Sequence, residues 1–233
     1  SRGLGDVYKR QCEFSAKVFH PLKVGRVIAR PFLGDNSGTF FRTKNRKDYT
    51  FPPPNKTLCD LVVENNRSCH AIGKIADIFS NRGISTSVSG LSDDALFYKM
   101  IDVIKKAKNG DLIFANFGEF DSLYGHRRDV AGFAAALERF DLKLVKLLEI
   151  INPNDFLIIT ADHGNDPTFK GTDHTREKVP VLMVGNYAQK GNNGTIVFSD
   201  VGATMAAFLN LSGKLKGTNI FNDNNKLEKK CKT

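Results

Sequence analysis

The chain has 233 residues, of which 41% are hydrophobic and 25% are charged, and its formal net charge is +9. These proportions are typical of a globular protein. No uninterrupted apolar segment approaches the roughly 20 residues of a membrane span. We therefore expect a cytoplasmic protein with no membrane partner. The basic residues are scattered and do not alternate with aromatic ones, so we also expect no nucleic-acid partner.

The first eleven residues differ in character from the rest of the chain. The run Asp6–Gln11, DVYKRQ, matches the translation of a transposon end that is used to build sequencing libraries. We therefore interpret residues 1–11 as a sequencing-adapter junction scar and expect the natural protein to begin upstream of it. A natural polar N-terminus is the alternative interpretation.

Residues 12–50 predict a small unit of strands and turns. Val24–Phe32 alternates apolar and basic residues, which favours a strand, and the run Gly34–Gly38 that follows is typical of a turn. Three consecutive prolines, Pro52–Pro54, form a stiff extended break. We expect a domain boundary there, with a second domain over residues 51–225 and a basic tail over residues 226–233.

From Thr57 onward the chain alternates between helical and strand patterns. Thr57 and Asp60 form a capping-box pattern that opens a helix ending near Asn65. Further helices are expected over Leu96–Ile104, Phe133–Leu148 and Val201–Leu209 (the last capped by Asp200), and strands over Asp111–Phe117, Phe156–Ala161, Val179–Val184 and, more weakly, Thr195–Phe198. This order predicts an α/β fold with a mostly parallel sheet flanked by helices.

Metal-type ligands follow two of these strands. They are Asp121 and His126 after the first strand, and Asp162, His163 and His174 after the second. Ligands bind beyond the carboxyl ends of parallel strands, so two neighbouring strands would bring all five to one site. Carboxylate with imidazole suits Mn²⁺ or Zn²⁺ better than Mg²⁺. Five ligands suit two metal ions, and paired metal ions assist phosphoryl transfer. Taken singly, each Asp-His pair is more typical of a turn or a helix cap.

Several segments resemble the phosphopentomutase family of the alkaline phosphatase superfamily. The two most specific are TADHGNDPTFKGTDHTREKVP (Thr160–Pro180) and FDSLYGHRRD (Phe120–Asp129), and GRVIARPF (Gly25–Phe32), FRTKNRKDY (Phe41–Tyr49) and AIGKIADIF (Ala71–Phe79) match as well. The resemblance extends from about Cys12 to Phe221. It implies an alkaline-phosphatase-like α/β core over residues 51–225, and it implies that residues 12–50 are the C-terminal part of a smaller α+β cap domain.

The resemblance also implies a reaction and a set of ligands. Members of the family interconvert ribose 1-phosphate, or deoxyribose 1-phosphate, and the 5-phosphate through a phosphothreonine enzyme, two Mn²⁺ ions and a sugar bisphosphate activator. By analogy, Asp121, His126 and His174 would hold one ion, and Asp162 with His163 would help to hold the other. No segment matches the family's N-terminal aspartate or its nucleophilic threonine. We therefore expect a C-terminal fragment that is inactive by itself.

Substrate contacts follow from the same resemblance. Arg26 and Arg42 would hold the distal phosphate, since guanidinium groups match phosphate oxygens. The backbone of Ile28 would touch the sugar, and Lys74 would approach the transferred phosphate. Another metal-dependent mutase or a phosphatase of the superfamily is the first alternative, and a non-catalytic basic nucleic-acid-binding module is the second. The oligomeric state and the preferred pentose stay open.

Overall fold

The computed structural model describes residues 2–43 and 45–221, except for the side chains of residues 2–6 and 42. The chain divides into two compact units. The smaller unit comprises Ser1–Asn55 with Ala76–Arg82, and the larger unit comprises Lys56–Ile75 with Gly83–Thr233. The predicted basic tail, residues 226–233, lies outside the described residues.

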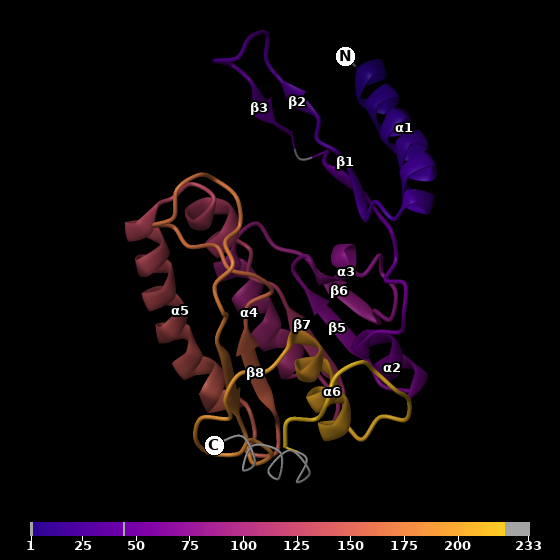
Figure 1. The fold of residues 1–233 in the computed structure, drawn as a ribbon. Coiled ribbons are helices and arrows are strands. Elements are labelled where there is room, and N and C mark those ends of the chain that lie inside the picture. The colour runs from indigo at the N-terminus through magenta and orange to yellow at the C-terminus, as the bar shows by residue number, and fades with distance from the viewer. Residues whose placement is uncertain (1, 44, 222–233) are drawn as a thin grey trace. The chain divides into compact units, whose positions relative to one another are not determined.

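In its described residues, the smaller unit contains the helix α1, the short 3₁₀ helix η1 and two short antiparallel strand pairs (Figure 1). Its elements are α1 (Arg2–Phe19), η1 (His20–Leu22), β1 (Arg26–Ala29), β2 (Phe32–Leu33), β3 (Phe41–Arg42) and β4 (Lys47–Thr50). β1 pairs with β4 and β2 with β3. The strand predicted over Val24–Phe32 is therefore broken near Pro31, which lacks the N–H group needed to continue a ladder. Residues 2–11, interpreted as a junction scar, form part of α1.

Helices and strands alternate through the larger unit (Figure 1). Its elements are α2 (Leu58–Glu64), β5 (Cys69–Ile72), β6 (Thr86–Val88), α4 (Asp93–Ile104), β7 (Leu112–Ala115), η2 (Phe120–Gly125), α5 (Val130–Ile150), β8 (Leu157–Thr160), β9 (Val181–Val184) and α6 (Phe198–Phe208). The short helix α3 (Ile75–Ile78) spans the sequence boundary between the two units. The predicted helix after Thr57 is confirmed, and Thr57 and Asp60 form the capping box.

Strands β6, β5 and β7 form a parallel sheet with β5 in the centre. Alternate side chains of a strand point to opposite faces. Ile72 accordingly packs with Phe97 and Met100 of α4 in the main apolar cluster, which Leu147 of α5 also joins. Cys69 faces the other way, where α2 contacts β5. The α/β fold with helices on both sides of a parallel sheet is thus confirmed.

The second strand pair of the larger unit differs from the prediction. β9 runs antiparallel to β8, and in the described part of the chain no ladder joins β8 to β7. The prediction that β7 and β8, the two strands that precede the candidate ligands, are neighbours in one sheet was therefore wrong. A parallel return needs a crossover, usually a helix, over one face of the sheet. Residues 161–180, which connect β8 to β9, form no helix.

The weak strand predicted over Thr195–Phe198 is also wrong. Phe198 is the first residue of α6, and the Asp200 carboxylate accepts a hydrogen bond from the Val197 N–H group at 3.1 Å. A second Asp200 oxygen accepts from Thr218 N–H at 2.9 Å. The first bond satisfies an N–H group at the start of the helix, and the second fixes the Asp200 carboxylate there; together they outweigh the β preference of the residues that precede the helix.

Candidate metal centre

The candidate ligands lie on two segments of the larger unit. One is η2, a short π-helix that follows β7, and the other is the loop over residues 161–180 that follows β8. Gly164 and Thr175 form an isolated antiparallel bridge within the loop, so His163 and His174 are held next to each other although eleven residues separate them. Local backbone pairing therefore brings together two histidines of the loop.

The π-helical turn explains why ligands five residues apart can share a side. In an α-helix, residues at this spacing point about 140° away from each other. In η2 the His126 N–H group donates to the Asp121 carbonyl at 2.9 Å, which is the wider i→i+5 bond of a π-helix. The wider turn places the Asp121 carboxylate within 3.4 Å of His126 Nε2.

Three potential ligand atoms converge from the two segments. His174 Nε2 lies 3.2 Å from Asp121 Oδ1 and 3.1 Å from His126 Nε2. Ligands bonded to one ion at about 2.1 Å, at tetrahedral or octahedral angles, would stand roughly 3.0–3.4 Å apart. The spacing of the three atoms fits that range, and the mixed nitrogen and oxygen set suits Mn²⁺ or Zn²⁺.

Hydrogen bonding prepares His126 to act as a ligand. Its Nδ1 lies 2.6 Å from the Thr172 carbonyl oxygen, which can only accept, so Nδ1 carries the proton. The neutral ring therefore has its lone pair on Nε2, the atom that faces Asp121 and His174. Such bonds to the second ring nitrogen are usual for metal-binding histidines. The ligand side chains are 33–46% exposed, so an ion or substrate can reach them.

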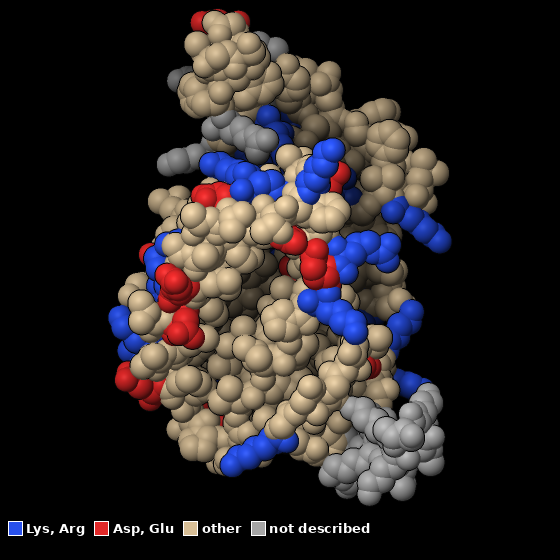
Figure 2. All heavy atoms as spheres, turned by 60° about the vertical axis from the view of Figure 1, so that its left-hand side comes forward, with Lys and Arg blue, Asp and Glu red and all other residues tan. Residues whose placement is uncertain are grey.

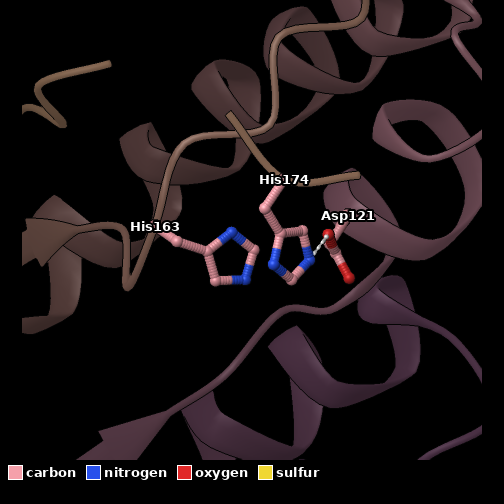
Figure 3. Close-up of side chains that lie close together, drawn as sticks. All are labelled: Asp121, His163 and His174. Atoms are coloured by element: carbon pink, nitrogen blue, oxygen red, sulfur yellow. Dashed lines mark ion pairs between the residues drawn. The ribbon is translucent and has the colours of Figure 1, made fainter. Parts of the chain in front are cut away.

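His163 joins this group, whereas Asp162 stays at its edge. The His163 ring stacks on the His174 ring with centroids 3.7 Å apart, and Figure 3 shows Asp121 on the far side of His174. Atoms of Asp121, His163 and His174 all lie within 4.8 Å of one another. The Asp162 carboxylate is 3.7 Å from His163 Nε2, and its side chain is 69% exposed. The structure thus gathers four of the five expected ligands closely.

Two neighbours of the ligands were not expected from the sequence. Asn165 donates its amide to Asp121 Oδ1 at 2.7 Å, and Arg128 donates to Asn165 Oδ1 at 2.7 Å. Both lie within segments that resemble the phosphopentomutase family. Polar residues of a loop have no periodicity, however, so nothing else in the sequence marks them as partners.

Lys74 lies at the same end of the parallel sheet as η2. It follows β5, and its Nζ atom is so close to Gly118 that a Cβ on this glycine would come within 2.9 Å of it. The nearby Asp93 carboxylate accepts from the N–H groups of Gly118 and Glu119, each at 2.9 Å. Burial, followed by the charge of Glu119, raises the pKa of Asp93 above its ordinary value, although these two bonds and Lys74 oppose the shift.

The expected phosphate-binding residues belong to the smaller unit. Arg26 lies on β1, with Nη1 3.6 Å from Asp48 Oδ2, and Ile28 is the half-buried register partner of Asp48. The guanidinium of Arg46 donates two 2.8 Å bonds to Asp48 and thereby lowers the pKa of this carboxyl. The backbone of Arg42 lies in β3, and its side chain is outside the described residues.

The surface shows mixed charge. On the face drawn in Figure 2, lysine and arginine side chains are interspersed with aspartate and glutamate. Over residues 2–43 and 45–221, no helix combines the length and the apolar character needed to cross a membrane.

Comparison with known proteins agrees with this chemistry. The model of the Metalloenzyme superfamily matches residues 65–213, which include all five expected ligands. The chain is 46% identical over 207 residues to phosphopentomutase of Agrobacterium fabrum, and 48% identical over 212 residues to that of Chelativorans sp.. These matches cover 88% and 91% of this chain but only 51% and 52% of the relatives, so the chain spans about half their length.

A solved structure supports the fold alone. The PH0037 protein from Pyrococcus horikoshii superposes with a TM-score of 0.55 at 15% sequence identity, over 78% of this chain and 60% of that protein. The matched family model covers well over half of the chain and contains the converging carboxylate and imidazole groups. The chain therefore belongs to the Metalloenzyme superfamily.

Proposed function

We propose that this chain forms the metal-binding and phosphate-holding part of a phosphopentomutase, an isomerase that interconverts ribose 1-phosphate, or deoxyribose 1-phosphate, and the 5-phosphate. The convergence of Asp121, His126 and His174 carries the proposal, because three groups of the right chemistry meet at ligand spacing. The identity of 46–48% to curated phosphopentomutases supports the choice of reaction.

The proposed cofactor is a pair of Mn²⁺ ions. Asp121, His126 and His174 would hold one of them, and Asp162 and His163 would contribute to the other. The donor set fits, since carboxylate with neutral imidazole suits Mn²⁺. When bound, such ions neutralise phosphoryl oxygens and lower the pKa of a hydroxyl nucleophile.

The chain's own residues would position the substrate. Lys74 would meet the phosphate that is transferred, and its closeness to Gly118, in the segment that leads into η2, supports this role. Arg26 would hold the distal phosphate together with Arg42, and the backbone of Ile28 would touch the sugar. Because Arg46 already binds Asp48 with two hydrogen bonds, Arg26 keeps N–H donors for a phosphate.

The proposed reaction also needs groups that this chain does not match. No segment of it resembles the threonine nucleophile or the N-terminal aspartate of the phosphopentomutase family. We expect these groups to come from the half of the relatives that this chain does not span, and we expect the chain alone to be inactive. A sugar bisphosphate would prime the phosphothreonine, and the reaction would take place in the cytoplasm.

A chimera tests the proposal. This chain is joined to the half of the Agrobacterium fabrum phosphopentomutase that it does not match, and conversion of ribose 1-phosphate is followed with and without Mn²⁺. We expect Mn²⁺-dependent isomerisation that His174→Asn abolishes and that Asp173→Asn, at the neighbouring position, leaves intact. A folded, Mn²⁺-binding chimera that hydrolyses phosphate esters but never isomerises the sugar would refute the mutase and favour a phosphatase.

A further inference from the structure

We infer that Arg128 is the positioning residue of this metal centre: it fixes the loop over residues 161–180 against η2 and, through Asn165, sets the orientation of the Asp121 carboxylate. This inference rests on the proposed metal site. It concerns how the ligands are held and adds no ligand to the set.

The guanidinium of Arg128 connects the two segments that carry the ligands. Nη1 donates to the Gly125 carbonyl at 3.0 Å, at the end of η2, and to the Asp166 carbonyl at 2.9 Å, in the loop. Nη2 donates to the Asp173 carbonyl at 2.6 Å, and Nε donates to the Gly171 carbonyl. One planar group therefore binds η2 and both ends of the segment that leads to His174.

A relay of hydrogen bonds runs from Arg128 to the carboxylate. Arg128 Nη1 donates to Asn165 Oδ1 at 2.7 Å. A cation beside an amide oxygen fixes which way the amide points, so the Asn165 NH₂ group faces Asp121 Oδ1, also at 2.7 Å. With one lone pair of Oδ1 engaged by Asn165, the rotation of the carboxylate is restricted, and its remaining lone pairs are available to His174 or an ion.

The same residue supports the histidine ligands. Thr172, whose carbonyl fixes the proton of His126, lies between the two loop residues whose carbonyls bind Arg128 Nε and Nη2. If the guanidinium were removed, residues 171–173 would lose these bonds, and the Thr172 carbonyl would no longer be held opposite His126. The tautomer of His126 and the place of His174 would then both be less well defined.

The backbone of Arg128 has a conformation that supports a specific role. Its φ is +55°, in the left-handed region that residues other than glycine rarely adopt. Such a conformation is strained and persists where surrounding interactions determine it. The fork of guanidinium donors supplies these interactions, and the single ammonium of a lysine could not reach the five acceptors together.

The first test measures Mn²⁺ affinity of the whole chain, from the free-ion electron paramagnetic resonance signal. We expect Arg128→Lys to weaken binding on the order of 10- to 100-fold, the usual effect of removing an outer-shell partner. Its neighbour Arg127 is exposed, and Arg127→Lys serves as the matched control. Asn165→Ala removes only the relay and should also weaken binding, without loss of the carbonyl contacts of Arg128. If Arg128→Lys or Asn165→Ala bound Mn²⁺ like the wild type, the inference would be overturned.

The second test uses no metal, so it separates this inference from the proposed function. Hydrogen exchange of residues 164–175 should be faster in Arg128→Lys than in Arg127→Lys, and ¹⁵N spectra should show the Nδ1–H form of His126 lost only in the former. Equal exchange and an unchanged tautomer would refute the positioning role even if Mn²⁺ binds. Conversely, failure of the wild-type chain to bind Mn²⁺ would refute the metal site and leave this second result to decide on Arg128. If Arg128→Lys does not fold, the Mn²⁺ affinity of Asn165→Ala decides, because this variant lacks the relay to Asp121 but keeps the carbonyl contacts of Arg128.

Discussion

Gly125, the last residue of η2, is predicted to be costly to replace even by alanine. A Cβ at this position would lie 2.5 Å from Asn165 Nδ2 and 2.6 Å from Asn165 Cγ, whereas ordinary contact begins at 3.4 Å. Asn165 would therefore have to withdraw by about 0.9 Å, which is enough to stretch its 2.7 Å bond to Asp121 beyond hydrogen-bonding distance.

The cost of Gly125→Ala can be estimated from the bond that breaks. A hydrogen bond to a charged group stabilises the folded protein by about 1.5–3 kcal/mol. Replacing glycine by alanine stabilises it by only about 0.5–1 kcal/mol, because the unfolded chain then has lower entropy. We expect a net loss of about 1–2 kcal/mol in the free energy of unfolding, measured by urea denaturation. Mn²⁺ affinity, titrated on the same samples, should fall at least about tenfold.

Gly202 provides the matched control for this substitution. It lies inside α6, and a Cβ there would meet nothing within 4 Å. Gly202→Ala should therefore stabilise the protein by about 0.5–1 kcal/mol and leave Mn²⁺ binding unchanged. A Gly125→Ala protein that unfolds at the wild-type urea concentration and binds Mn²⁺ equally well would refute the reasoning. The hydrogen bond from Asn165 to Asp121 would then contribute neither to stability nor to Mn²⁺ binding.

Three further predictions concern the fold. Phe97 is 1% exposed within the main apolar cluster, so Phe97→Ala should lower the free energy of unfolding by about 3–5 kcal/mol in guanidinium denaturation; a loss below about 1 kcal/mol would contradict that packing. Thr57→Ala removes the capping box of α2 and should lower the free energy of unfolding by about 1 kcal/mol, measured in thermal melts. An unchanged melting temperature would show that the capping box does not stabilise the helix. Burial would raise the pKa of Asp111, but the N–H groups of Lys108 and Ser68, with His70, outweigh it and hold this pKa below its ordinary value. The resulting stability is fully present above the unfolded pKa of about 4 and is lost as the pH falls through the folded value. The difference in the free energy of unfolding between wild type and Asp111→Asn should therefore shrink between about pH 7 and pH 3, and a constant difference would contradict this reasoning.

Elements whose signals are local were predictable from the sequence. The helix after Thr57 was predicted because its capping box involves only four consecutive residues, and the hydrogen bonds of the box form within them. The long helix α5 was found from its apolar period. One margin of that stripe nevertheless faces solvent, since Leu137 is 51% exposed and Leu148 is 48% exposed. Periodicity gives the direction of an apolar face but not the width that its neighbours cover.

Features that depend on distant partners could not be predicted in the same way. The antiparallel direction of β9 depends on the path of the loop over residues 161–180, which has no periodic signal. The candidate ligands were recognised because carboxylate and imidazole at strand ends indicate metal chemistry. Arg128 and Asn165 were not recognised, because their partners lie 37–45 residues away or are backbone carbonyls that no sequence pattern marks.

The π-helical turn of η2 has a consequence for how related genes can vary in length. Deleting one residue between Asp121 and His126 would allow an ordinary α-helical turn, in which residues four apart still lie within about 40° of each other. The two ligands would keep their common side, and Arg128, two residues beyond His126, would keep its orientation relative to them. We expect relatives with this shorter turn to keep both ligands and an arginine at the position of Arg128.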